Sequence, residues 1–239
     1  MMASSETAIG GGDVRFQKTL WTVILGSSTP EERRKAFGEL VRLYWKPVYF
    51  YIRRRGSSVE DAKDLTQEFF SVGLEKDFLR SVSRSAGKFR TFLIAALNHF
   101  LSKRRRHDRA AKRGGGHVVS LDFSGVEGTI PARSDESPEA GFDRQWVVAL
   151  IEESLARLRE ESGREGRLQE FDALAPVLTQ GSRHYDAIAQ SLGWTNQEVA
   201  RRVFAYRTRL RALIEAQIRE SVTSAGDFEE EVKAIFSIF

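Results

Sequence analysis

The stretch YDAIAQSLGWTNQEV, residues 185–199, decides the fold, because two helical patterns meet in it at a glycine. Ala189 is small, as a residue must be where two helices cross closely, and Gly193 follows four residues later, at a tight turn where a side chain would clash. Val199 stands six residues further on, where an apolar side chain packs back on the first helix. This spacing predicts a helix-turn-helix.

The second helix of the pair is predicted over about 196–221 and has two different faces. Thr195 and Glu198 form a capping box at its start. Apolar residues recur at intervals of three and four, which predicts a buried seam made of Val199, Val203, Tyr206, Leu210 and Leu213.

The opposite face of this helix carries Gln197, Arg201, Arg207, Thr208 and Arg211. Amide and guanidinium groups of this kind read base edges and bind phosphates in a major groove. Arg201 is the best candidate for a base contact, with a solvated surface arginine as the alternative. Phe204 is expected in the core rather than against a thymine methyl group.

The rest of the chain is also predicted to be helical, so the predicted fold class is all-α. Helical spacing of apolar residues extends over about 14–25, 30–56, 58–74, 89–113, 142–161, 167–178 and 228–239. Thr29, Pro30 and Glu32 supply a cap and a capping box for the second of these helices. Pro47 lies inside it, and because proline removes a hydrogen bond there, a kink or break is expected near Lys46.

A change of composition at the glycine run 114–116 divides the chain. The segment 114–141 is rich in Gly, Ser, Pro and Asp, which is typical of a flexible linker. The sequence therefore predicts two helical domains, 14–113 and 142–222. Residues 223–239 form an amphipathic tail, which we expect to cover the protein's own core, with a regulatory contact as the alternative.

Two charged clusters lie in the first predicted domain. The basic run Lys103–Arg113 continues a helix with aromatic positions and is suited to phosphate contacts, with a solvated face as the alternative. The polar residues Asp61, Asp64, Gln67 and Glu68 share one helix face, at the start of which Ser58 and Asp61 form a capping box. This face is either solvated, or a docking surface for a basic partner, or an incomplete set of metal ligands.

Composition excludes several classes of protein. The chain has 239 residues, no cysteine and a formal charge of +4, so disulfides, zinc–cysteine sites and thiol catalysis are absent. The four histidines are scattered and form no ligand spacing, so the sequence predicts neither a metal site nor a cofactor. No apolar stretch is long enough to predict membrane insertion, and the first residues show no secretory signal.

Taken together, these segments resemble the RNA polymerase sigma factors of the extracytoplasmic-function group, over about residues 16–222. The sequences YWKPVY at 44–49 and EDAKDLTQEFF at 60–70 are similar to region two of that family, whose Asp-x-x-Gln-Glu-x-Phe core is specific. The sequence FRTFL at 89–93, with the helix that follows, is similar to the element that reads and opens the −10 region. Residues 185–211 are similar to region four, which reads the −35 element.

The resemblance implies a role for each matching residue. Contacts to core RNA polymerase are implied for Asp61, Asp64, Gln67 and Glu68. Contacts to the −10 region are implied for Phe89, Arg90, Phe92, Asn98, Ser102, Arg105 and Arg106, although the family often carries an acidic residue at position 102. Contacts to the −35 element are implied for Thr195, Asn196, Gln197, Arg201, Arg207, Thr208 and Arg211.

Aromatic and cationic groups near the start of the −10 element suggest how promoter DNA is opened. An unstacked base needs an aromatic or apolar pocket, with cations nearby for the strand. We expect the loop 75–87, together with Phe89, Arg90 and Phe92, to capture such a base.

The resemblance implies a bacterial cytoplasmic protein that is not an enzyme. Its partners would be core RNA polymerase and promoter DNA, with an anti-sigma factor or a regulatory kinase as possible additions. The alternative is a helix-turn-helix regulator that acts without polymerase, which would leave the acidic face without a task. A metal-dependent nuclease using Asp61, Asp64 and Glu68 is a third, weaker alternative.

Overall fold

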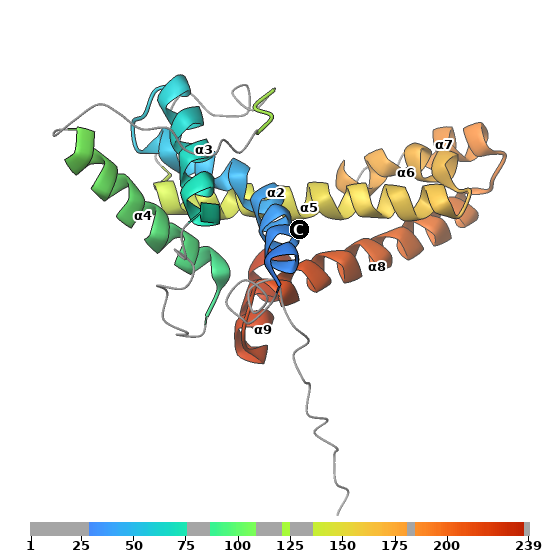
Figure 1. The fold of residues 1–239 in the computed structure, drawn as a ribbon. Coiled ribbons are helices and arrows are strands. Elements are labelled where there is room, and N and C mark those ends of the chain that lie inside the picture. Colours follow the sequence, from blue (N-terminus) through green and yellow to red (C-terminus); the bar gives the residue numbers. More distant parts are fainter. Residues whose placement is uncertain (1–28, 76–86, 109–120, 125–135, 181–184, 237–239) are drawn as a thin grey trace, which may run out of the picture.

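The computed structural model describes residues 29–75, 87–108, 121–124, 136–180 and 185–236. Within these ranges the chain forms α-helices joined by turns, with one isolated antiparallel bridge between Lys88 and Val222 (Figure 1). The all-α fold class is therefore confirmed. The helix predicted over 14–25 and most of the predicted base-capturing loop lie outside the described residues.

The helices follow the predicted order with shifted ends. They are α2 (Pro30–Arg54), α3 (Val59–Glu75), α4 (Phe89–Asp108), α5 (Pro138–Arg164), α6 (Leu168–Gln180), α7 (Tyr185–Leu192), α8 (Asn196–Glu220) and α9 (Ala225–Phe236). Helix α5 begins four residues before the predicted start because Ser137 caps it, accepting a hydrogen bond from the Ala140 N–H at 3.1 Å. None of the described helices is both long enough and apolar enough to cross a membrane.

Local capping signals place two helix starts where the sequence predicts them. The Thr29 hydroxyl accepts from the Glu32 N–H at 3.2 Å, and the Glu32 carboxylate accepts from the Thr29 N–H at 2.9 Å. This reciprocal pair is the predicted capping box of α2. At α3, the Ser58 hydroxyl accepts from the Asp61 N–H at 3.1 Å and donates to the Asp61 carboxylate at 2.7 Å.

Of the kink or break predicted near Lys46, the break does not occur, since α2 runs unbroken through Pro47. The kink stays a prediction. Packing explains the difference. Every residue from Pro47 to Ile52 is buried, so the tertiary contacts of this segment offset the hydrogen bond that the proline removes. A helix interrupted at this point would expose that apolar surface to water.

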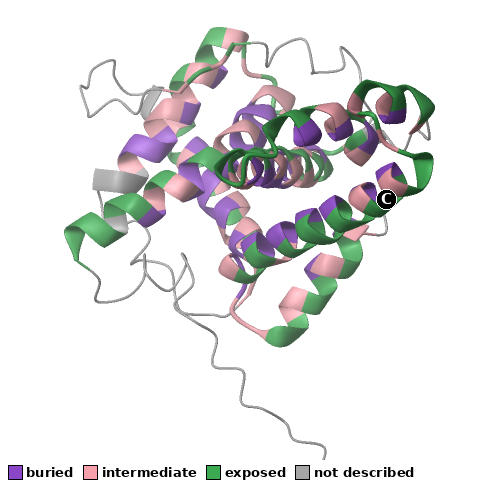
Figure 2. Cartoon of the chain, turned by 90° about the vertical axis from the view of Figure 1, so that its right-hand side faces the viewer, coloured by how far each residue is buried: buried purple, intermediate pink, exposed green. Residues whose placement is uncertain are grey.

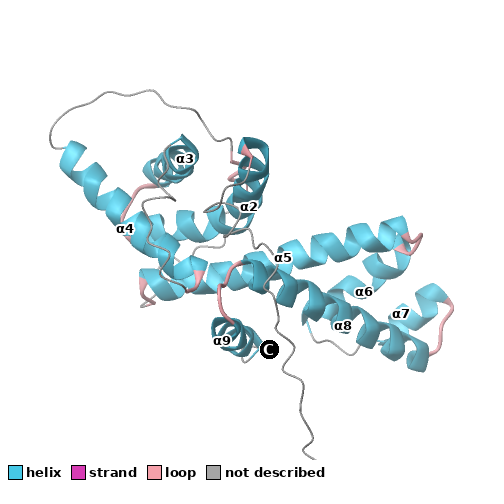
Figure 3. Cartoon of the chain, turned by 60° about the horizontal axis from the view of Figure 1, so that its bottom comes forward, coloured by secondary structure: helices cyan, strands magenta, loops and turns pink. Residues whose placement is uncertain are grey.

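The largest interface between helices joins α2 to α5. Tyr44 of α2 stacks on Phe142 of α5, with ring centroids 6.4 Å apart, and Tyr51 meets the same ring edge-on at 6.3 Å. The buried residues of α2 to α4 and of α5 to α9 belong to one cluster. Helix α5 therefore links the two halves of the chain, with α4 near one end and α6 and α7 at the other (Figures 1 and 3).

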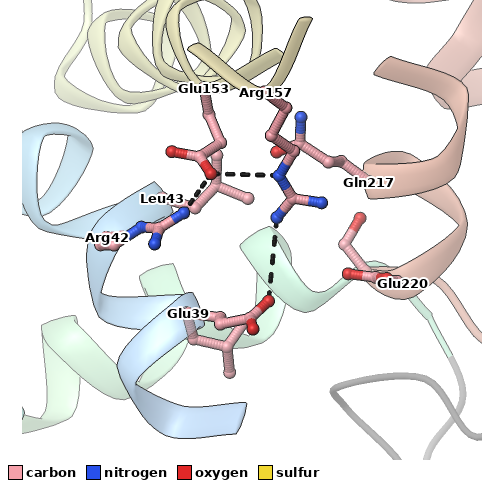
Figure 4. A pocket seen from close by; sticks show the side chains of 9 residues that line it. Glu39, Arg42, Leu43, Glu153, Arg157, Gln217 and Glu220 are labelled. Atoms are coloured by element: carbon pink, nitrogen blue, oxygen red, sulfur yellow. Dashed lines mark hydrogen bonds and ion pairs between the residues drawn. The ribbon is translucent and has the colours of Figure 1, made fainter. Parts of the chain in front are cut away.

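Charged side chains close the junction of α2, α5 and α8 around a small pocket (Figure 4). Glu153 of α5 pairs with Arg42 of α2 and with Arg157 at 3.1 Å, and Arg157 reaches Glu39 at 3.8 Å. Glu220 of α8 lines the same pocket, and burial raises the pKa of its carboxyl group. These pairs join α2 to α5 beside the end of α8.

The tail is helical and covers part of the core. Ile235 of α9 is 1% exposed, and Val232 and Phe236 are half-buried. In Figures 1 and 3, α9 lies on the side of α5 opposite to α3. Phe239, which the sequence places on the same apolar side, lies outside the described residues.

The unbroken α2 gives a stability prediction. Pro47→Ala is expected to raise the free energy of unfolding by about 1–2 kcal/mol. A proline inside a helix costs about 3 kcal/mol, and its stiffening of the unfolded chain offsets about 0.4–1 kcal/mol of that, with some ring packing lost besides. Chemical denaturation measures the effect. Pro30→Ala is the control, because Pro30 sits in the first turn where no N–H bond is lost; a gain no larger than this control's would contradict the prediction.

Candidate nucleic-acid interface

Helix, turn and helix lie at the residues where the sequence predicts them. Helix α7 ends at Leu192, Gly193 has a φ of 69°, and the Trp194 N–H donates to the Ala189 carbonyl at 2.8 Å. The predicted reason for the glycine was wrong, since a Cβ at this position would meet nothing within 4 Å. Glycine is needed because the turn requires a left-handed backbone conformation.

Helix α8 separates its faces as predicted (Figure 2). All five seam positions are buried, from 0% exposure at Val199 to 8% at Leu210 and Leu213. The Thr195 hydroxyl caps the helix by accepting from the Glu198 N–H at 3.2 Å. The seam and the cap together fix which face of α8 is left outside.

The outer face of α8 is polar, cationic and well exposed. The Arg201 side chain is 71% exposed, and its nearest acidic neighbour is Glu198 at 3.4 Å within the same helix. Gln197 is exposed one turn before Arg201, and Thr208 is exposed two turns after it. This arrangement presents amide and guanidinium donors along one face, of the kind that can read base edges in a DNA groove. The Thr208 hydroxyl donates to the Phe204 carbonyl at 2.9 Å and is left as an acceptor.

Phe204 corrects the sequence analysis. It was expected in the core, but it is 73% exposed and lies between Arg201 and Thr208 on the outer face. The prediction failed because Val203, the preceding residue, occupies the buried position of this helical turn. The exposed ring is accessible to a partner, and the thymine methyl group considered for it is chemically suitable.

Three other predicted −35 residues are held by neighbouring groups. The Asn196 amide donates to the carboxylate of Asp186 in α7. Arg207 donates to the Val177 carbonyl of α6 at 2.9 Å, and Arg211 donates to Glu215 at 2.8 Å. These bonds orient the three side chains. The Arg201 side chain, at 71%, is more exposed than that of Arg211, at 59%.

The predicted −10 residues fall into two groups in space. Ser102, Arg105 and Arg106 are exposed along the second half of α4. By contrast, Phe89 is 3% exposed and packs against Tyr44 with ring centroids 4.9 Å apart.

The remaining −10 residues also have partners inside the protein. The Asn98 amide oxygen accepts from the Tyr51 hydroxyl at 2.9 Å. Arg90 pairs with Glu231 at 3.0 Å and with Asp143. Phe92 is half-buried. Phe89 and Arg90, two of the residues expected to capture an unstacked base, are therefore engaged inside the protein, so such a role requires the surrounding helices to move.

The predicted polymerase-binding face on α3 is partly engaged within the chain. Glu68 accepts from Arg104 of α4 at 2.6 Å, and Asp61 is used by the Ser58 cap. Asp64 is exposed and Gln67 is half-exposed. Across the described ranges, no three His, Cys, Asp or Glu side chains are placed so as to hold a metal ion.

Comparison with known proteins agrees with the motifs. The chain is 26% identical to RNA polymerase sigma factor YlaC of Bacillus subtilis over 171 residues, which cover 70% of this chain and 86% of the relative. It is 23% identical to RNA polymerase sigma-H factor of Pseudomonas aeruginosa over 190 residues, which cover 79% and 91% of the two chains. No family model matches the chain, and no solved structure gives a significant match. The predicted resemblance to RNA polymerase sigma factors is thus confirmed.

The turn between α7 and α8 can be tested by adding one methyl group. Gly193→Ala is expected to lower the free energy of unfolding by about 1–2 kcal/mol, because a left-handed backbone is unfavourable for residues with a Cβ. Urea unfolding followed by circular dichroism measures it. Gly38→Ala is the control: it is exposed within α2 with open space around its Cβ, and should stabilise by about 0.5–1 kcal/mol. Equal effects of the two substitutions would show that backbone conformation does not explain Gly193.

Proposed function

We propose that this protein is a sigma factor that binds core RNA polymerase and directs initiation of transcription at specific promoters. In this proposal the outer face of α8 reads the −35 element, α4 reads and opens the −10 region, and the acidic face of α3 docks on polymerase. The observation that carries the proposal is the outer face of α8, where Arg201 and Phe204 stand exposed over a fully buried seam.

The similarity to two sigma factors over more than two thirds of each chain supports the polymerase partner. The placement of the two DNA-facing elements supports promoter recognition, since α4 and the α7–α8 pair lie at opposite ends of α5 (Figure 1). Two separate contacts on one chain reinforce each other, because the second becomes intramolecular once the first has formed.

The division of labour follows from the chemistry of each surface. The cationic groups Arg105 and Arg106 on α4 suit the phosphates of an opened strand, whose attraction depends on salt. The exposed carboxylate of Asp64 repels DNA and suits a basic protein surface instead. A regulator that works without polymerase would have no use for this acidic face, and it is the alternative that the following experiment separates.

The docking face is tested with purified core polymerase. We expect the full chain to co-elute with the core enzyme and to start RNA at defined positions on a genomic DNA library. Asp64→Ala should weaken core binding about tenfold, as loss of one central interface contact does. Glu160→Ala, which removes an exposed acidic charge from α5, is the control and should bind as the unmodified chain does. Initiation without any association with core polymerase, or association without initiation, would contradict the proposal.

The −35 role is tested on promoter variants. Arg201→Ala should cost about 1–3 kcal/mol at one base pair of the promoter and relax specificity there, if the guanidinium contacts a base. Arg164→Ala on α5, where the side chain is 76% exposed, is the control and should leave promoter choice unchanged. A loss that is uniform over all promoter variants would assign Arg201 to phosphate binding. No loss at all would remove α8 from promoter recognition.

A further inference from the structure

The C-terminal helix α9 contacts residues that the proposed function assigns to DNA at both ends of the molecule. Its Glu231 pairs with Arg90, a predicted −10 residue at the start of α4. Its Phe236 lies under the guanidinium of Arg211, a predicted −35 residue of α8, at 4.6 Å from the ring centre. One short helix therefore occupies cations of both predicted DNA-facing elements.

The contact with the start of α4 is an ion-pair cluster around one buried carboxylate, which we call the α9 clasp and define as Lys88, Arg90, Glu230 and Glu231. Glu230 lies at its exposed edge. The Glu231 side chain is 1% exposed and lies 3.0 Å from Arg90 and 3.1 Å from Lys88. Lys88 also reaches Glu230 at 3.0 Å. Burying a carboxylate is costly unless cations pair with it, so Glu231 can stay inside only while Arg90 and Lys88 remain beside it.

Backbone hydrogen bonds join the two elements beneath the clasp. Lys88 and Val222 form an antiparallel bridge, in which the Phe89 N–H donates to the Ser221 carbonyl at 2.9 Å. The Gly87 N–H donates to the Thr223 hydroxyl at 3.0 Å. These bonds hold the start of α4 against the junction of α8 and α9. The residues that they join are more than 130 positions apart in the chain.

The same groups would have to serve DNA in the proposed function. Arg90 stacks over Trp146 at 5.3 Å and donates to Asp143 and Glu231, so its guanidinium is directed into the protein. A DNA phosphate would seek the same donors that the Glu231 carboxylate now holds, since both are anions that accept hydrogen bonds from a guanidinium. The clasp and the DNA strand therefore exclude each other at Arg90.

We propose that α9 is an intramolecular competitor of promoter DNA, which holds the start of α4 closed until the clasp opens. This inference rests on the proposed function and adds regulation of the same site. The cluster suits a switch with two states, because removing either side leaves uncompensated charge in a buried place and partial opening is unfavourable. Helix α9 leaves the polymerase-binding face free, as it lies on the side of α5 opposite to α3 (Figure 3).

The first test weakens the clasp with an isosteric substitution in the full chain. Glu231→Gln removes the buried charge and should raise initiation with core polymerase about tenfold, on a promoter first identified with the unmodified protein. Glu229→Gln removes an exposed charge from the same helix and should change nothing. The proposal is overturned if Glu231→Gln, with an unchanged circular dichroism spectrum, initiates no better than Glu229→Gln.

The second test locks the clasp and does not depend on how Glu231→Gln folds. The chain has no cysteine, so Lys88→Cys with Val222→Cys creates one possible disulfide, at a pair of bridge residues whose separation suits such a bond. The reduced variant lacks one clasp cation and is the weakened clasp, whereas in the oxidised variant the disulfide replaces the Lys88 ion pairs and holds the start of α4 against the junction of α8 and α9. The oxidised form should initiate at least about tenfold less than the reduced form of the same variant, while both co-elute with core polymerase. The unmodified chain under the same reductant is the control.

The outcomes separate this inference from the proposed function. Equal initiation by the oxidised and reduced forms would overturn the competition and leave the sigma-factor proposal standing. Loss of polymerase binding on oxidation would also overturn it, because the lock would then act on docking and not on DNA. If no form binds polymerase or initiates RNA, the proposed function fails and this inference falls with it.

Discussion

The packing of α2 on α5 is the constraint on which the rest of the structure depends. The segment from Pro47 to Ile52 is buried all round, so it needs apolar partners on more than one side. Phe142 of α5 is one of them, fully buried and edge-on to Tyr51 at 6.3 Å. Because α5 continues beyond this contact to pack on α6 and α8, the same helix positions the α7–α8 pair. Nearer its start, Asp143 and Trp146 of α5 both contact Arg90 of α4.

Features of the fold that depend on neighbouring residues, such as helix caps and buried helix faces, could be predicted from the sequence. The cap at Thr29 and the seam of α8 depend on residues three or four positions apart, and both were found as predicted. Thr195 caps α8, but the Glu198 carboxylate pairs with Arg201 instead of completing the predicted capping box. Signals that tertiary packing can override were less reliable. Burial of the surrounding residues kept α2 continuous at Pro47. Phe204 is exposed because its neighbour Val203 occupies the buried position of the helix.

Contacts between distant parts of the chain could not be predicted from the sequence. Arg90 and Glu231 are 141 positions apart, and acidic and basic residues occur on almost every helix, so nothing in one sequence indicates which pair meets. The predicted site therefore divides by the kind of signal. The outer face of α8 followed from periodicity, whereas the engagement of Phe89 and Arg90 inside the protein needed the structure.

Burial also determines how the α9 clasp would respond to its surroundings. Salt screens exposed charges within about 10 Å at 0.1 M, but it screens a buried pair much less. Contacts between DNA phosphates and exposed groups such as Arg105 or Arg201 therefore weaken as salt rises, while the pairing of Arg90 with Glu231 changes little. Rising ionic strength consequently favours the closed arrangement, and the approach of many phosphates at low ionic strength favours the open one.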